Sequence, residues 1–227
     1  MQQGALIVGA GSGISASLAR LLEREGYAVA LASRGKAKRA EGVPAVLRLE
    51  CDAADTASVA AMFARLDAEL PPLDVVLYNP SYRTRGPLIE LAPEDVRRSL
   101  DVTAFGAFLV AQQAARRMLA RGSGNILFTG ASASVKGYAQ SAPFAMGKFA
   151  LRGLAQSMAR ELAPRNIHVA HLVIDGAVRS AERRETPDQP DSMLDPDAIA
   201  QTYLQIIRQP RSAWAWEIEL RPWVEKF

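Results

Sequence analysis

Short, strongly apolar segments alternate with longer amphipathic segments along almost the whole 227-residue chain. Most of the short segments read as nearly continuous apolar runs, which is typical of parallel strands buried on both faces. In the longer segments, apolar residues recur at helical spacing. The alternation predicts an α/β fold over 1–227, with a doubly wound, mostly parallel sheet of about seven strands and helices on both faces.

The pattern gives approximate limits for each element. Pro93 and Pro196 are expected at helix starts, where a missing N–H group costs nothing. The polar, proline-containing stretch 179–195 is expected to form a mobile surface loop. The expected strands are 5–8, 27–32, 46–49, 74–78, 125–128, 167–174 and 213–220. The expected helices are 14–25, 56–69, 93–121, 143–163 and 196–208.

Composition excludes several classes of protein. The apolar fraction of 49% and the charged fraction of 22% are those of a globular domain. A net charge of +3 without a long basic run argues against a nucleic-acid partner. No segment approaches the roughly 20 apolar residues of a membrane helix, and the first apolar run is too short for a signal peptide. The single cysteine, Cys51, is expected to be a small core residue, and the simplest location is the reducing cytoplasm.

A glycine-rich turn follows the first expected strand and opens the first expected helix. Glycines let the backbone approach a pyrophosphate, and the free N–H groups of the helix start attract its charge. The turn therefore predicts a dinucleotide site, although a glycine-rich turn without a ligand would look the same. Its expected cofactor-binding residues are Gly9, Gly11, Ser12, Gly13 and Ile14.

The end of the second expected strand bears on the choice of cofactor. An acid there accepts hydrogen bonds from the adenosine ribose, whereas an arginine accommodates a 2′-phosphate. This chain has Arg34, with Lys36 and Lys38 nearby, which favours NADP(H) over NAD(H). The other interpretation is that Arg34 is an ordinary solvated loop residue.

From about residue 4 to about residue 178, these features resemble the short-chain dehydrogenase/reductase family. The family's GxxxGxG motif matches Gly9, Gly13 and Ser15, so that serine replaces the last glycine. The resemblance implies a single-domain Rossmann fold that binds NADP(H). It also implies that Asp52 contacts the adenine ring, with Ala53 next to it, and that Asn79 belongs to the cofactor site.

The resemblance breaks in the segment that carries catalysis in the family. Relatives have Tyr-x-x-x-Lys, and this chain has Phe144 four residues before Lys148, so the family's proton donor is missing from its position. An ungapped match places Ala131 at the catalytic serine, while a shift of one residue places Ser132 there. Thr103 lies near the place of an asparagine that supports the lysine in relatives.

Two functions remain open. The first is an NADP(H)-dependent oxidoreductase for a small carbonyl compound or an activated C=C bond, in which Lys148 holds the nicotinamide ribose. Its proton donor would be Tyr138, Tyr82, Ser132 or a water held by Lys148. The second is a catalytically weak or inactive NADP(H)-binding protein with a sensing or scaffolding role. Each alternative donor also has an ordinary packing or surface interpretation.

The remaining expectations concern the C-terminal third. The resemblance places Val178 beside the nicotinamide carboxamide, and it maps the family's substrate-covering loop to 179–195. His168 and His171 lie three apart in a strand, so they face opposite sides and cannot share a metal. The last expected strand, 213–220, is followed by an aromatic tail, 221–227, that is hard to bury within one domain. The tail could cap the sheet edge of its own chain, yet exposed aromatic residues favour subunit contacts. Relatives assemble through helices that match 93–121 and 143–163, and a homodimer or homotetramer is therefore expected.

Overall fold

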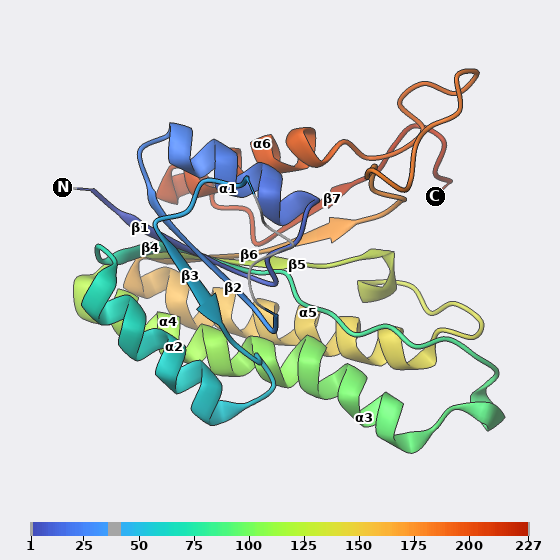
Figure 1. Ribbon diagram of the computed structural model, residues 1–227, viewed down its shortest axis with the longest axis horizontal. Helices are drawn as coiled ribbons and strands as arrows, with labels where there is room; N and C mark the ends of the chain where they lie inside the picture. The colour runs from blue at the N-terminus through green and yellow to red at the C-terminus, as the bar shows by residue number, and fades with distance from the viewer. Residues whose placement is uncertain (1, 36–41, 227) are drawn as a thin grey trace.

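A single parallel sheet lies between two layers of helices (Figure 1). The computed structural model describes residues 2–35 and 42–226. The strand order within this part of the chain is β3-β2-β1-β4-β5-β6-β7, and every neighbouring pair is parallel. The predicted fold class is therefore confirmed. The strands are β1 (Gly4–Val8), β2 (Ala28–Ser33), β3 (Leu47–Glu50), β4 (Leu73–Tyr78), β5 (Gly124–Thr129), β6 (Ile167–Ile174) and β7 (Glu217–Leu220).

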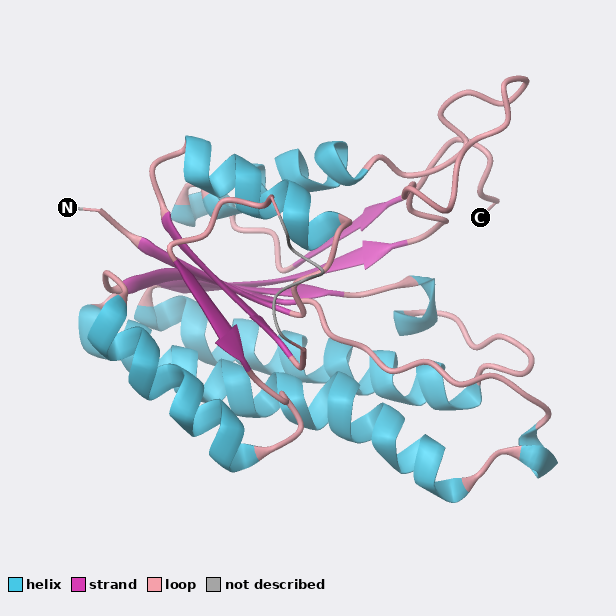
Figure 2. Cartoon of the chain, viewed as in Figure 1, coloured by secondary structure: helices cyan, strands magenta, loops and turns pink. Residues whose placement is uncertain are grey.

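Helices cover both faces of the sheet (Figure 2). One layer contains α1 and α6, and the other contains α2, α4 and α5, with α3 packed against α5. Asp55 and Asp195 cap α2 and α6 by accepting hydrogen bonds from backbone N–H groups. The helices are α1 (Ile14–Arg24), α2 (Thr56–Glu69), α3 (Pro93–Leu100), α4 (Gly106–Arg121), α5 (Ala142–Leu162) and α6 (Pro196–Ile207). Short helical turns are η2 (Leu88–Glu90), η3 (Asp101–Phe105), η4 (Ser132–Ser134), η5 (Ala163–Arg165) and η6 (Arg211–Ala213).

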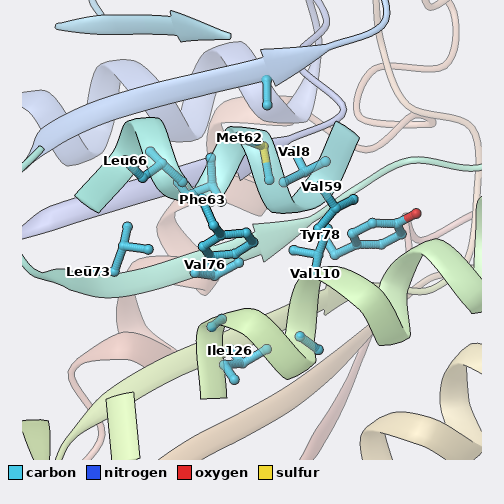
Figure 3. Packing of buried hydrophobic residues seen from close by; sticks show 14 of the residues in the cluster. Val8, Val59, Met62, Phe63, Leu66, Leu73, Val76, Tyr78, Val110 and Ile126 are labelled. Atoms are coloured by element: carbon cyan, nitrogen blue, oxygen red, sulfur yellow. The ribbon is translucent and has the colours of Figure 1, made fainter. Parts of the chain in front are cut away.

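The core consists of two apolar clusters, one on each face of the sheet. Alternate residues of a strand point to opposite faces, so Leu6 and Val8 of β1 join one cluster while Ala5 and Ile7 join the other. Figure 3 shows side chains of the first cluster, in which Phe63 of α2 packs among strand residues such as Val76. Burial on both faces explains why these strands read as continuous apolar runs.

Two predicted elements differ from the observed ones. The expected helix 93–121 is divided by η3, a π-helical turn. The turn brings Gly106 against the sheet so closely that a Cβ atom there would lie 2.6 Å from the Tyr78 hydroxyl and 2.7 Å from the Ala53 carbonyl oxygen. The carbonyl of Val102 also accepts a hydrogen bond from Tyr78. Close packing of helix on strand therefore widens the helix at this point.

The last strand is also shorter than predicted, because it begins at Glu217 instead of residue 213. Gln209 holds the segment before the strand: its side-chain oxygen accepts a hydrogen bond from the Ala215 N–H at 2.8 Å, a backbone group that a longer strand could have used. The Gln209 carbonyl oxygen accepts from the Trp214 indole at 3.0 Å. The Trp214 ring stacks on His168. Trp214 therefore packs within the chain, whereas Trp223 of the tail is exposed.

Across residues 2–35 and 42–226, none of the helices combines the length and the apolar character that crossing a bilayer requires.

Candidate functional site

A cleft lies at the carboxyl ends of β1 and β4. Strand order reverses between these two neighbours, and open α/β sheets bind ligands at such a switch point. The cleft has a volume of about 730 Å³. Its walls include residues predicted to bind the cofactor: Gly9, Gly11, Arg34, Asp52, Ala53 and Asn79.

The three glycines of the turn have different structural roles. Gly9 has a φ of +85°, and a Cβ atom there would lie 2.8 Å from the Pro80 nitrogen, so this position requires glycine. At Gly11 and Gly13 an added Cβ atom would meet no described atom within 4 Å. Both glycines line cavities in front of α1, so a side chain at either would take up space there. The turn thus leaves open a cradle at a helix N-terminus, which fits a pyrophosphate.

Ser15 fits into the tight junction between α1 and the sheet. Its side chain is buried, and the hydroxyl donates a hydrogen bond to the Gly9 carbonyl oxygen at 3.0 Å. The same hydroxyl accepts a hydrogen bond from the Asn79 side-chain amide at 2.8 Å. The serine that replaces a family glycine therefore ties the turn to the end of β4.

The end of the cleft next to β2 and β3 contains Arg34 and Asp52. Arg34 is exposed at the end of β2, on the wall of the cleft. Asp52 accepts a hydrogen bond from the Ala54 N–H at 3.1 Å, which fixes the loop after β3. Lys36 and Lys38, which were expected to assist Arg34, lie outside the described residues.

Ile14 and Val178 line a smaller cavity of about 300 Å³ beside the glycine turn. Val178 pairs with Leu194 in an isolated parallel bridge, which anchors the two ends of loop 179–195. Ser12 is exposed at the tip of the turn. The structure therefore brings Ile14 and Val178 together at one cavity.

A third cavity, of about 480 Å³, contains the residues expected at the reacting centre. Phe144, near the start of α5, and Ser132, in η4, both line it, and so does Tyr138. Ala131 precedes η4 and donates its N–H to the Ser134 hydroxyl at 3.1 Å. Of the two residues that could take the place of the catalytic serine, Ser132 lines this cavity.

Lys148 is buried on α5, one helical turn after Phe144. Its ammonium group donates a hydrogen bond to the Thr129 carbonyl oxygen at 2.7 Å and lies 5.8 Å from the centre of the Phe144 ring. Burial lowers the pKa of Lys148 to about 7, because the charged form loses its hydration. The lysine is thus close to the cavity and titrates near neutral pH.

Tyr82 follows β4, and Thr103 belongs to η3. The Tyr82 hydroxyl donates to an Asp95 carboxylate oxygen at 2.9 Å, and Arg98 stacks over its ring. Thr103 is buried, and its hydroxyl oxygen lies 3.4 Å from the Tyr82 N–H. Tyr82 is therefore already engaged with α3.

Sequence reasoning missed the arginines of the site. Arg83 and Arg85 follow β4 and line the 480 Å³ cavity. Arg98 of α3 lines the 730 Å³ cleft. Arg183, from loop 179–195, lines both smaller cavities. None of these residues belongs to a motif with regular spacing, so only their position after parallel strands could have indicated them.

The two histidines are structural. His168 and His171 face opposite sides of β6: His168 stacks on Trp214, and His171 lies 3.3 Å from the Ser134 hydroxyl and 3.0 Å from a Glu217 carboxylate oxygen. Burial lowers the pKa of His171 to about 4 despite the carboxylate beside it. Cys51 is buried at the end of β3, as expected for a core residue.

Comparison with known proteins agrees with this geometry. Residues 3–191 match the family model described as short chain dehydrogenase. The chain is 29% identical over 174 residues to the 3-oxoacyl-acyl-carrier-protein reductase MabA of Mycobacterium bovis, covering 76% of this chain and 68% of the relative.

Solved structures give the same result over nearly the whole chain. A short-chain dehydrogenase from Rhodopseudomonas palustris is 34% identical, with a TM-score of 0.81 over 98% of this chain and 100% of the other. A gluconate 5-dehydrogenase from Burkholderia cenocepacia, in complex with NADP and tartrate, is 25% identical, with a TM-score of 0.84 over 97% of this chain and 94% of the other. The chain belongs to the short-chain dehydrogenase family of oxidoreductases.

Proposed function

We propose that the protein is an NADP(H)-dependent oxidoreductase that acts on a small carbonyl compound or an activated C=C bond. The observation that carries this proposal is the open glycine cradle in front of α1, which shares a cleft with Arg34. The cavity of Phe144 and Ser132 would take the substrate. In support, the gluconate 5-dehydrogenase structure contains NADP.

The described residues suit the parts of such a cofactor. The cradle of Gly11 and Gly13 would hold the pyrophosphate, Arg34 a 2′-phosphate, and Asp52 the adenine ring. NADPH, when bound, supplies a hydride equivalent to an electrophilic carbon. The protein's part is to orient the substrate, exclude water and provide a proton.

The favoured proton donors are side chains of the cavity itself. Phe144 has no hydroxyl, and the Tyr82 hydroxyl is engaged with Asp95. Ser132 and Tyr138 line the same cavity as Phe144, and the exposed ring of Tyr138 leaves its hydroxyl accessible. We favour the hydroxyls of Ser132 and Tyr138 as proton donors. Lys148 would be the cation that stabilises the negative charge developing on the substrate during the reaction.

Restoring the family tyrosine tests the proposal. We expect Phe144→Tyr to raise the rate of NADPH oxidation, over a panel of aldehydes, ketones and enones, by at least about tenfold, because a positioned general acid contributes a factor on the order of 10²–10⁴. Fluorescence titration should show NADPH binding to both proteins with similar affinity. Absence of NADPH binding to the native protein would refute the proposed function.

A second function is favoured by a specific contact. The Lys148 ammonium group already donates to Thr129, and Phe144 supplies no acid, which is compatible with an NADP(H)-binding protein of low activity. If NADPH binds but Phe144→Tyr stays inert, the binding role is the better description. If the native protein already turns over as fast as ordinary relatives, the binding role fails.

Location and assembly also remain proposals. We propose a cytoplasmic protein, since buried Cys51 is unpaired, and a homodimer or homotetramer that forms through α4 and α5. No nucleic-acid or membrane partner is proposed.

A further inference from the structure

The cavity that contains Phe144 and Ser132 also collects three arginine side chains from two distant segments. Arg83 and Arg85 belong to the segment after β4, and Arg183 belongs to the loop after β6. Figure 1 shows these segments at the carboxyl edge of the sheet. Because like charges repel, their convergence in one cavity requires an explanation.

The carboxylates of the cavity do not balance these charges. Asp175 is buried, and one of its oxygens lies 3.2 Å from the Lys136 ammonium group and 3.2 Å from the Arg221 guanidinium. Its charge is therefore already compensated. Among the described carboxylates, none forms an ion pair with Arg83, Arg85 or Arg183. Only Glu225, exposed at the rim, offers a further negative charge.

Arg179 of the same loop is arranged differently, because it forms an ion pair with Asp195 that closes the base of the loop. Partial burial, together with repulsion from Arg85 and Arg183, lowers the pKa of Arg83. Arg83, Arg85 and Arg183 are exposed, and no described carboxylate forms an ion pair with them, so an anionic ligand can reach their guanidinium groups.

Arg83 is also placed against the expected reacting centre. Its guanidinium carbon lies 4.8 Å from the centre of the Phe144 ring, a cation–π contact that fixes the group above the ring. An anion bound to Arg83 would therefore lie beside Phe144 and Ser132. The cavity volume of about 480 Å³ suits a small molecule.

We propose that the substrate is a small organic acid whose carboxylate binds Arg83, with Arg85 and Arg183 beside it, while its carbonyl or C=C group faces Phe144 and Ser132. This inference rests on the proposed function. Planar guanidinium groups match a carboxylate through paired hydrogen bonds, which gives orientation as well as affinity. The anionic end then sets which carbon faces the reacting centre.

Arg83 provides the sharpest test. Arg183 also lines the cavity of Gly13 and Val178, so its loss would affect cofactor binding too. Arg83 lines the substrate cavity and stacks on Phe144. Arg184 is the matched control, because it is an exposed arginine adjacent to Arg183 on the same loop.

The experiment compares acids with their neutral esters. The protein is saturated with NADP⁺, and binding of acetoacetate and 4-oxopentanoate is measured against their methyl esters by ligand-observed NMR. We expect each acid to bind at least about tenfold more tightly than its ester, and Arg83→Gln to remove most of that preference. Arg83→Lys should keep part of it, and Arg184→Gln should leave it unchanged.

Two results would overturn the inference: equal binding of acid and ester, or equal effects of Arg83→Gln and Arg184→Gln. A separate titration with NADPH distinguishes the two proposals. If NADPH does not bind, the proposed function fails. If NADPH binds to native and Arg83→Gln protein alike but the acids show no preference, only the substrate assignment fails.

Discussion

Ser15 shows how one hydroxyl can stand where the family has glycine. The side chain is buried at the junction of α1 and the sheet, and its oxygen both donates to Gly9 and accepts from Asn79. A buried hydroxyl without partners would cost about 1–3 kcal/mol. The two hydrogen bonds avoid that penalty and fix the glycine turn to β4.

The proposed preference for NADPH depends on Arg34. We expect Arg34→Asp to weaken NADPH binding by at least about tenfold, because a charge-assisted contact to phosphate is lost and a repulsive charge is added. NADH binding should change little or improve. Fluorescence titration of both nucleotides measures this, with Arg24→Gln, an exposed arginine of α1, as the control. Tighter binding of NADH than NADPH by the native protein would contradict the role given to Arg34.

His171 gives the fold a defined response to acid. Burial lowers its pKa from 6.5 to about 4, so between these values the unfolded chain binds a proton that the folded chain does not. Stability should therefore fall as pH falls through this window. The protonation of His171 is expected to lower the free energy of unfolding by about 2 kcal/mol between pH 7 and pH 5.

Urea unfolding at several pH values measures this effect. We expect the native protein to lose more stability on acidification than His171→Gln, which cannot titrate. His168→Gln is the comparison variant, because it removes the other histidine of β6, whose pKa is also lowered by burial on the opposite face of the strand. If native protein and His171→Gln lose stability in parallel, a folded His171 with an ordinary pKa is indicated.

At the scale of elements, the glycine turn and α1 form one unit in which different glycines support the chain conformation and leave space for a ligand. Gly9 supports the chain conformation through its positive φ and its approach to Pro80, whereas Gly11 and Gly13 leave space in front of the helix. The η3 turn has a similar role between α3 and α4, because it lets Gly106 touch the end of β4. Both devices position backbone at the edge of the cleft.

Alanine substitutions should therefore act differently within the turn. We expect Gly13→Ala to lower NADPH affinity by at least about tenfold with little change in melting temperature, because the added methyl group occupies the cradle. Gly9→Ala should lower the melting temperature, because the left-handed conformation and Pro80 both oppose a side chain. Gly153→Ala, on α5 with open space around it, is the control. Equal losses of stability at positions 9 and 13 would contradict the distinction.

At the scale of the whole molecule, two features concern surfaces. The C-terminal segment packs on the loop after β6: Trp223 donates its indole N–H to the Pro190 carbonyl oxygen at 3.0 Å, and Pro222 lies against Gly176. The tail thus supports the cavity of Phe144 and Ser132 in its own chain. Separately, Phe105 of η3, Phe108 of α4 and Phe149 of α5 are exposed by 46%, 41% and 45%.

These exposed rings support the proposed homo-oligomer. We expect Phe108→Arg combined with Phe149→Glu to shift the protein toward monomer in size-exclusion chromatography with light scattering, because charges replace apolar contact area. Val46→Arg, which changes an apolar residue exposed by 67% before β3, should leave the mass unchanged. A native protein that is monomeric at all concentrations tested would contradict the proposal.

The amino-acid sequence alone determined the layered α/β fold, since apolar periodicity reports burial on each side of a strand or helix. It also located the glycine turn, Arg34 and the Phe144–Lys148 pair, because these depend on residues near one another in the chain. Tertiary structure alone decided that Ser132 lines the cavity with Phe144, that β7 begins only at Glu217, after the segment held by Gln209, and that Arg83 and Arg183 converge. The reason is physical: such contacts join segments far apart in sequence, and only packing of the sheet and its loops brings them together.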